Sequence, residues 1–142
     1  MNVSSILKSK GAVVETIRPD STLGAAIDAL TQKRIGVLVV SEDGDAILGI
    51  ISERDIVTGL SKHGASLLDM PVASMMTQTV KTCAPSDPIT FVMELMTNRR
   101  IRHVPVMTDE KLSGIVSIGD AVKHRLSELE TEAGYLRDYI AH

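Results

Sequence analysis

Two Ser-x-x-Asp segments carry the clearest chemistry in the sequence: Ser52 with Asp55, and Ser117 with Asp120. Each follows an apolar run and begins a segment with helical periodicity, so each is expected at the start of a helix. There the pair can form a capping box, in which the serine and the acid each accept a backbone N–H. The same position can also hold a ligand, because a helix N-terminus favours a phosphate and the carboxylate can accept both hydroxyls of a ribose. The two roles are compatible.

Cationic residues precede the second pair. Arg102 and His103 enter an expected strand, whose alternation sends them to opposite faces, so one of them can reach a site beside Asp120. The alternative for His103 is a hydrogen-bonded, partly buried imidazole. Arg99 and Arg100 end a helical segment and are interpreted as solvated charges that complement its C-terminus.

Signals for catalysis are missing from the sequence. It has no nucleophile elbow, P-loop, GxGxxG or metal-spaced histidine pair, and Ser117 has no identifiable base. Cys83 is the only cysteine, which excludes an intrachain disulfide and a cysteine-rich metal site. We therefore expect a binding protein, not an enzyme, with no metal and no catalytic cofactor.

The elements that position these residues occur twice, because the chain is a tandem duplication. Pro19 aligns with Pro85, Arg34-Ile35 with Arg100-Ile101, and, after a one-residue gap, Gly49 with Gly114. Each copy predicts the order β-α-β-β-α. The ranges expected in the first copy are a strand over 14–17, a helix capped by Ser21, a hairpin of strands 37–40 and 47–51, and a helix from Ser52. Those in the second are a helix capped by Asp87 with Pro88 at its first position, strands 104–106 and 112–116, and a helix from Ser117.

One copy alone is too small to bury its apolar faces, so the copies are expected to pair in an α+β fold with pseudo-two-fold symmetry and a C-terminal amphipathic helix. Met75 and Met76 suggest core packing beside a short capped helix between the copies. The expected organisation is an N-terminal segment packing on the module (1–13), repeat 1 (14–62), a connecting segment (63–79), repeat 2 (80–126) and a helical extension (127–142).

The C-terminal extension carries an apolar seam at alternating spacings of four and three residues. Its members are Val122, Leu126, Leu129, Ala133, Leu136 and Ile140. Such a heptad pattern favours packing against a partner helix, so we expect a homodimer. The alternative is that the seam folds back onto its own domain.

The amino-acid composition limits the classes of partner that the chain is expected to bind. Fifteen Lys and Arg against eighteen Asp and Glu give a net charge of −3, and aromatic residues make up 2% of the chain, so nucleic-acid binding is disfavoured. The N-terminus lacks the apolar core of a signal peptide, and no apolar run reaches membrane-spanning length. We expect a cytoplasmic protein without a membrane partner.

The repeated motifs resemble the tandem CBS (cystathionine-β-synthase) domain pair, or Bateman module. The resemblance runs from about Val3 to Leu126 and rests on the duplicated helix starts, on 34–40 and 100–106, and on the two Gly-hydrophobic-hydrophobic-Ser-x-x-Asp segments. It implies a stand-alone regulatory module that binds an adenine nucleotide such as AMP, ATP or NAD(H) in clefts between the copies. With no effector domain evident, its output would act in trans on an effector protein or through its own assembly. A dimeric scaffold with vestigial sites and a nucleic-acid binder using residues 99–103 are the alternatives.

The resemblance also implies which residues form the two sites, with ribose on the aspartate, phosphate near the serine and the base between aliphatic side chains. The second site comprises Thr82, Cys83, Arg102, His103, Val104, Pro105, Ser117 and Asp120. The first comprises Thr16, Ile17, Val37, Leu38, Ser52, Arg54 and Asp55. Cys83 has a second interpretation, as a small core hydrophobe.

The first copy departs from the second, so the sites are not expected to be equivalent. Gly36 and Val37 replace Arg102 and His103, and Glu53-Arg54 replaces Ile118-Gly119. Arg54 could contact phosphate in either copy or pair with a carboxylate. Glu53 makes a strongly anionic ligand less suitable for the first site.

Overall fold

The computed structural model describes residues 1–141, which fold into two compact units. The first-repeat unit comprises Val13–Lys81 and Thr108–Ser113. The second-repeat unit comprises Met1–Ala12, Thr82–Met107 and the chain from Gly114 onwards. The mixture of helices with short sheets confirms the predicted α+β class, and the predicted C-terminal helix is present.

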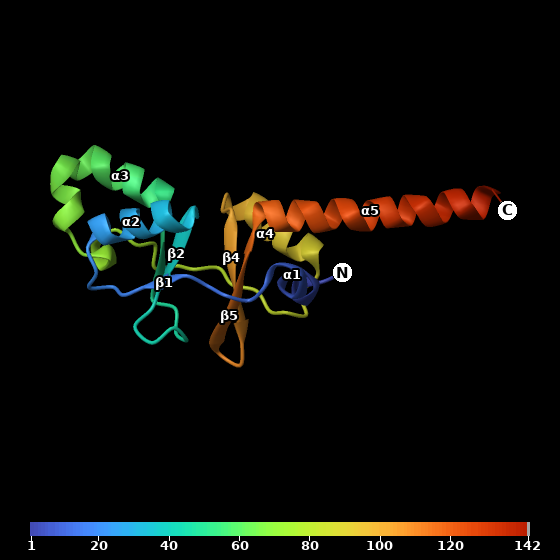
Figure 1. Cartoon of the computed structure of the whole chain (residues 1–142), viewed down its shortest axis with the longest axis horizontal. Helices are drawn as coiled ribbons and strands as arrows, with labels where there is room; N and C mark the ends of the chain where they lie inside the picture. Colours follow the sequence, from blue (N-terminus) through green and yellow to red (C-terminus); the bar gives the residue numbers. More distant parts are fainter. Residues whose placement is uncertain (142) are drawn as a thin grey trace. The chain divides into compact units, whose positions relative to one another are not determined.

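The first-repeat unit contains a three-stranded sheet in the order β1-β2-β3. Figure 1 labels β1 and β2 of this sheet. The elements of the unit are β1 (Thr16–Ile17), α2 (Leu23–Lys33), β2 (Val37–Val40), β3 (Gly49–Ser52) and α3 (Glu53–His63), followed by the 3₁₀ turns Gly64–Asp69 and Val72–Ser74. β1 pairs parallel with β2, and β2 and β3 form the predicted hairpin with Val37 opposite Ser52. The buried residues that form its core are Leu23, Ala26, Leu30, Leu38, Val40, Ile51, Ile56, Leu67 and Val72.

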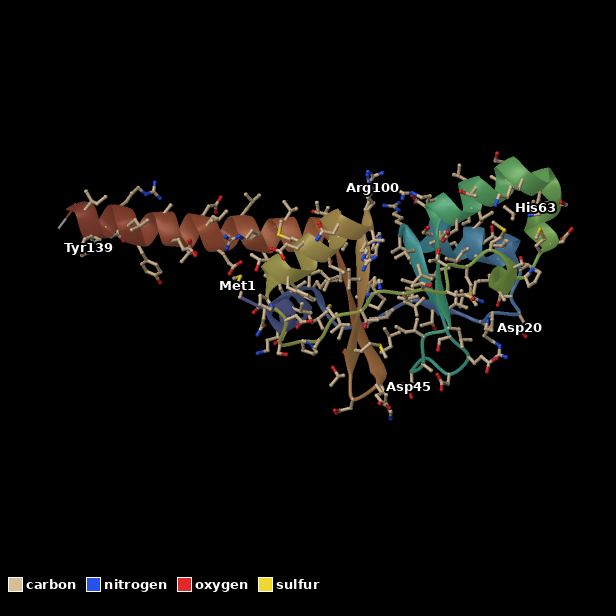
Figure 2. All side chains as sticks on the ribbon, turned by 180° about the vertical axis from the view of Figure 1, so that it is seen from behind. Met1, Asp20, Asp45, His63, Arg100 and Tyr139 are labelled. Carbon is tan, nitrogen blue, oxygen red and sulfur yellow. The ribbon has the colours of Figure 1, made fainter. Side chains whose placement is uncertain are left out.

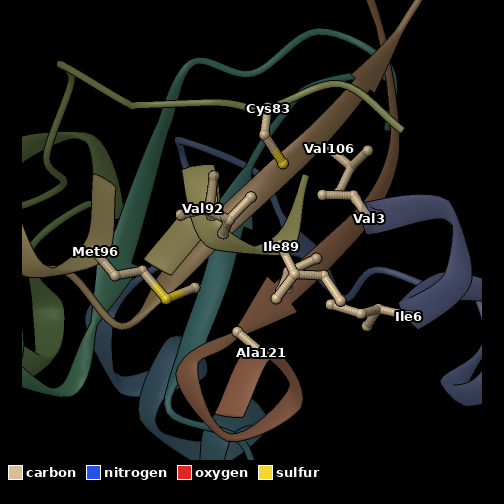
Figure 3. Close-up of a cluster of buried hydrophobic side chains, with 10 residues drawn as sticks. Val3, Ile6, Cys83, Ile89, Val92, Met96, Val106 and Ala121 are labelled. Carbon is tan, nitrogen blue, oxygen red and sulfur yellow. The ribbon is translucent and has the colours of Figure 1, made fainter. Parts of the chain in front are cut away.

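The second-repeat unit contains counterparts of α2, β2, β3 and α3, of which the last is longer, and it adds a helix at its N-terminal end. Its elements are α1 (Val3–Lys10), α4 (Ile89–Arg99), β4 (His103–Thr108), β5 (Lys111–Ser117) and α5 (Ile118–Ala141). β4 pairs with β5, and Cys83 makes a single parallel bridge to Val106. Its core draws Val3 and Ile6 of α1 together with residues of α4, β4, β5 and α5 (Figure 3). The N-terminal helix is therefore built into the fold of this unit.

Both predicted helix caps are wrong by one residue. Thr22 caps α2, accepting from the N–H of Ala25 at 3.1 Å, because Ser21 is held in the preceding turn by its bond to the Arg18 carbonyl. Before α4 the cap position is Pro88, since the Asp87 carboxylate accepts the N–H of Ala84 at 2.8 Å and closes the turn before the helix.

The connecting segment also differs from expectation. It forms two short 3₁₀ turns in place of one capped helix, because Pro71 separates them and has no N–H to continue a helical ladder. Leu67 and Val72 are fully buried there, and Met75 and Met76 pack against the core of the first-repeat unit as predicted.

Candidate functional site

The Ser117–Asp120 pair lies where β5 passes into α5. The N–H of Ser117 donates to Oδ2 of Asp120 at 2.9 Å, and the N–H of Asp120 donates to Oγ of Ser117 at 3.1 Å. These reciprocal bonds form the capping box that the sequence predicts. Both side chains remain partly exposed, so the capped helix start faces a region that a ligand could reach.

A third residue, which sequence analysis missed, completes this cluster. The ammonium of Lys10, at the end of α1, lies 2.7 Å from Oδ2 of Asp120 and 3.0 Å from the carbonyl oxygen of Ile115. Partial burial opposes ionisation of Asp120, but the hydrogen bonds from Lys10 and Ser117 outweigh it and hold the pKa of this carboxyl below its usual value. Asp120 is therefore an ionised acceptor at neutral pH, paired with a cation.

The Ser52–Asp55 pair makes the equivalent junction between β3 and α3. The N–H and the hydroxyl of Ser52 both donate to Oδ2 of Asp55 at 2.9 Å, and the N–H of Asp55 donates back to the serine at 3.3 Å. Here the additional donor is a neutral hydroxyl, since Oγ1 of Thr77 lies 3.0 Å from Oδ1 of Asp55. Thr77, like Lys10, was not predicted.

A backbone hydrogen bond places Arg102 and His103 beside the second junction. The first amide of α5, that of Ile118, donates to the carbonyl of Arg102 at 2.8 Å, which places the entry of β4 beside the Ser117 capping box. The Arg102 side chain is exposed and that of His103 is partly buried. The second-repeat unit thus gathers Arg102, His103 and Ser117 with Asp120 at one end of its sheet.

The strands point their side chains to two faces. Val104 and Val106 lie in the core of the second-repeat unit, so His103 and Pro105 occupy the other face of β4. In β2, Leu38 is likewise a core residue, and Val37 lies on the opposite face. Of the aliphatic residues expected around a base, Val104 and Leu38 belong to the core clusters. Pro105 and Val37 lie on the opposite strand faces, where they are also buried.

Cys83 contributes its side chain to the core and its backbone to the sheet. The thiol is 5% exposed and packs among the apolar residues of Figure 3, and burial, with a contribution from the charge of Asp87, raises its pKa to about 12. Its N–H donates to Pro105 at 3.0 Å, and its carbonyl accepts from Met107 at 2.9 Å. This placement matches the interpretation of Cys83 as a small core hydrophobe.

The neighbouring threonines are left with backbone groups directed away from the sheet. Because successive peptide groups of a strand point to opposite sides, the pairing of Cys83 with β4 turns the N–H and C=O of Thr82 away from that strand. Ile17 pairs with β2 in the same way, since its carbonyl accepts from Ser41 at 2.9 Å, so Thr16 is the equivalent residue in the first repeat. Both threonines are exposed, and Arg54 is exposed at the start of α3.

Residues 1–141 offer neither a metal-binding cluster nor a membrane-spanning helix. No group of three or more His, Cys, Asp or Glu side chains in this part of the chain could hold a metal ion. None of its helices combines the length and apolarity needed to cross a membrane.

Two units that share the order α-β-β-α, each with a capped Ser–Asp pair at its strand–helix junction, define the class of protein, and comparison with known proteins agrees. The family model described as "CBS domain" matches residues 4–62 and 72–127. The chain belongs to the CBS-domain family and carries a tandem pair, which confirms the resemblance found in the sequence.

Relatives match over most of the chain. The crystal structure of the CBS-domain containing protein ATU1752 from Agrobacterium tumefaciens is 40% identical, covers 88% of this chain and 99% of its own, and superposes with a TM-score of 0.85. A protein with CBS domains from Burkholderia ambifaria is 37% identical, with coverage of 89% and 95% and a TM-score of 0.83. The CBS domain-containing protein CBSX3, mitochondrial, of Arabidopsis thaliana is 36% identical over 97% of this chain and 71% of its own length. A CBS-domain pair is a regulatory module of the kind that binds adenosyl ligands.

Proposed function

We propose that this chain is a stand-alone sensor that binds adenine nucleotides such as AMP, ATP or NAD(H), with one candidate site in each unit. The observation that carries the proposal is the partly exposed carboxylate at each strand–helix junction, Asp120 and Asp55. An ionised carboxylate only accepts hydrogen bonds, and a ribose presents two hydroxyl donors on one edge. The capped helix start beside it offers a favourable position for phosphate.

The adenine base would lie beside Pro105 in one unit and Val37 in the other, whose buried side chains would supply apolar contacts. The exposed threonines Thr82 and Thr16 would supply backbone donors and acceptors for the base edge. This arrangement replaces the aromatic stacking that a chain with one Phe, two Tyr and no Trp lacks.

The two sites differ in charge. Around the second junction lie Arg102, His103 and Lys10, whereas Glu53 and Arg54 lie at the start of α3 beside the first. The second site is therefore the better match for a phosphate-bearing ligand, and the first for a ligand of lower charge.

Output would come from a partner protein in trans or from self-association in the cytoplasm. The family supports regulation over catalysis, and the seam of α5 supports a homodimer. Beyond its first turns this helix has little cover in the described chain: Leu126 is 55% exposed and Ile140 81%. Tyr139 projects from its outer end (Figure 2). The seam does not fold back onto its own unit, which favours a partner helix.

Calorimetric titration with AMP, ATP, NADH and adenosine tests the proposal. We expect saturable binding of at least one nucleotide, with a stoichiometry of one or two per chain. Failure of every ligand to bind would instead support a scaffold with vestigial sites, and salt-dependent binding of oligonucleotides would support the nucleic-acid alternative.

Deleting the chain from Leu129 onwards should convert the dimer into a monomer or a weaker dimer. The deletion removes most of the exposed seam but keeps Ala121, which is buried in the core, and Glu128, which pairs with the N-terminal ammonium at 3.0 Å. Light scattering at micromolar concentration measures the change. If the truncated protein still contains as many chains per particle as the full-length protein, the main dimer interface lies outside the deleted residues.

Replacing Arg102 with Gly and His103 with Val, the residues of the first copy, should weaken AMP binding more than adenosine binding. The expected loss for AMP is about tenfold, because a charge-assisted contact to phosphate is removed while the ribose and base contacts stay. Parallel titrations with the two ligands measure it. Equal weakening of both would indicate damage to the fold or the base pocket.

A further inference from the structure

Lys10 retains capacity for a further hydrogen bond at the second junction. A lysine ammonium has three N–H donors, and the bonds to Asp120 and Ile115 use two of them. The Lys10 side chain is 33% exposed and that of Asp120 24%, so the pair is open to a small molecule on one side.

The helix that carries Lys10 is fixed in the second-repeat unit. Val3 and Ile6 are 0% exposed in its core, and the N–H groups of Val3 and Ser4 donate to the carbonyls of Asp87 and Pro85, both at 2.9 Å. Leu7 lies directly over Gly114, where a Cβ would approach it to 2.7 Å. The ammonium is thus delivered by a rigid element, as a recognition group requires.

The first-repeat unit has the same arrangement with different chemistry. Gly49 aligns with Gly114, and the Met76–Thr77 segment lies over it, with 2.8 Å from the position of a Cβ to both Sδ of Met76 and the carbonyl of Thr77. In each unit, the segment that precedes the other repeat crosses a glycine and delivers one donor to the junction aspartate. Asp120 receives a cation and Asp55 a neutral hydroxyl.

We propose that Lys10 determines the specificity of the second-repeat site, selecting phosphate-bearing nucleotides over neutral nucleosides, an inference that rests on the proposed nucleotide-binding function. An unneutralised Asp120 would repel any phosphate on the ribose that it binds. Lys10 cancels that charge and offers its third N–H to an anionic oxygen. Thr77 leaves the charge of Asp55 in place, so the first-repeat site lacks this selection.

Titration of Lys10→Met with AMP and with adenosine tests the inference, in an Asp55→Ala background that removes the first site. We expect AMP affinity to fall about tenfold and adenosine affinity to change less than about twofold. Lys8→Met is the matched control, because Lys8 is exposed on the same helix, and it should retain the original ratio of AMP to adenosine affinity. Lys10→Arg, which keeps the charge, should restore most of that ratio.

The outcomes separate this inference from the proposed function. Equal loss of AMP and adenosine binding in Lys10→Met, or no loss of either, would overturn the role of Lys10 while nucleotide binding by the unsubstituted protein stands. Thermal unfolding of each variant shows whether the substitution has destabilised the fold. If Lys10→Met is destabilised, the titrations are made with Lys10→Gln, which keeps a polar donor but removes the charge. Absence of nucleotide binding by the unsubstituted protein would overturn both proposals.

Discussion

Replacing Asp120 with alanine is expected to weaken AMP binding at the second-repeat site by at least about tenfold. Each hydrogen bond from a ribose hydroxyl to an ionised carboxylate contributes about 1.5–3 kcal/mol, and the substitution removes both. Calorimetry measures the effect, because the number of AMP molecules bound with high affinity per chain shows how many sites remain in the variant.

The same substitution also costs stability, since Asp120 accepts from Ser117 and pairs with Lys10. Loss of a capping box costs about 1 kcal/mol, so unfolding has to be measured beside affinity. Asp120→Asn separates the two effects, because its carbonyl still accepts the Ser117 N–H while the charge is lost. A loss of stability without a loss of affinity would make Asp120 a structural cap only.

Comparison of AMP with 2′-deoxy-AMP identifies the ribose contact directly. The unsubstituted protein should prefer AMP, and Asp120→Ala should bind the two ligands with nearly equal affinity. Equal affinity in the unsubstituted protein would refute the ribose assignment. Asp55→Ala is the matched variant in the first repeat and should leave this discrimination at the second site intact.

The sequence predicts the elements well because duplication provides an internal check. A strand, helix or turn that appears in both copies at aligned positions is supported twice, and the Ser–Asp pairs stand at the strand–helix junctions where the pattern places them. The N-caps shift by one residue because Ser21 and Asp87 are used by the preceding turns, a competition that local propensity does not resolve.

The pocket residues were harder to assign. Cys83, Val104 and Leu38 belong to the aligned strands, but which strand face meets the core depends on register. Alternation with the neighbouring core residues Val106 and Val40 is the signal that separates them from His103, Pro105 and Val37.

Lys10 and Thr77 could not be found by aligning the repeats. Each lies in the segment before one repeat and binds the aspartate of the other, and Lys10 aligns with Met76, so no conserved pattern marks the pair. The sequence carries one indirect sign of these contacts, the alignment of Gly49 with Gly114. At each glycine the missing side chain leaves room for the segment that packs over it. Long-range contacts of this kind follow from tertiary packing, not from local periodicity.

Those glycines give a second large expected effect: Gly49→Ala should lower the free energy of unfolding by about 1–3 kcal/mol. The added Cβ would lie 2.8 Å from the carbonyl oxygen of Thr77, and that carbonyl is fixed by the Ile50 N–H at 2.9 Å. The Thr77 N–H also donates to Ile50 at 2.8 Å, so the crossing segment cannot retreat without breaking both bonds.

Denaturant unfolding measures the loss, with the same dependence of unfolding free energy on denaturant concentration (m-value) used for every variant. Gly114→Ala should cost less than Gly49→Ala, because the three atoms nearest to its Cβ all belong to the side chain of Leu7 and none is a backbone atom. Gly134→Ala is the control of opposite sign: it lies inside α5 with open space around it, and the helix propensity of alanine should raise stability by up to about 1 kcal/mol. If Gly49→Ala unfolds at the same denaturant concentration as the unsubstituted protein, the Met76–Thr77 segment does not cross β3 at this glycine, and the donor that Thr77 offers to Asp55 loses its structural basis.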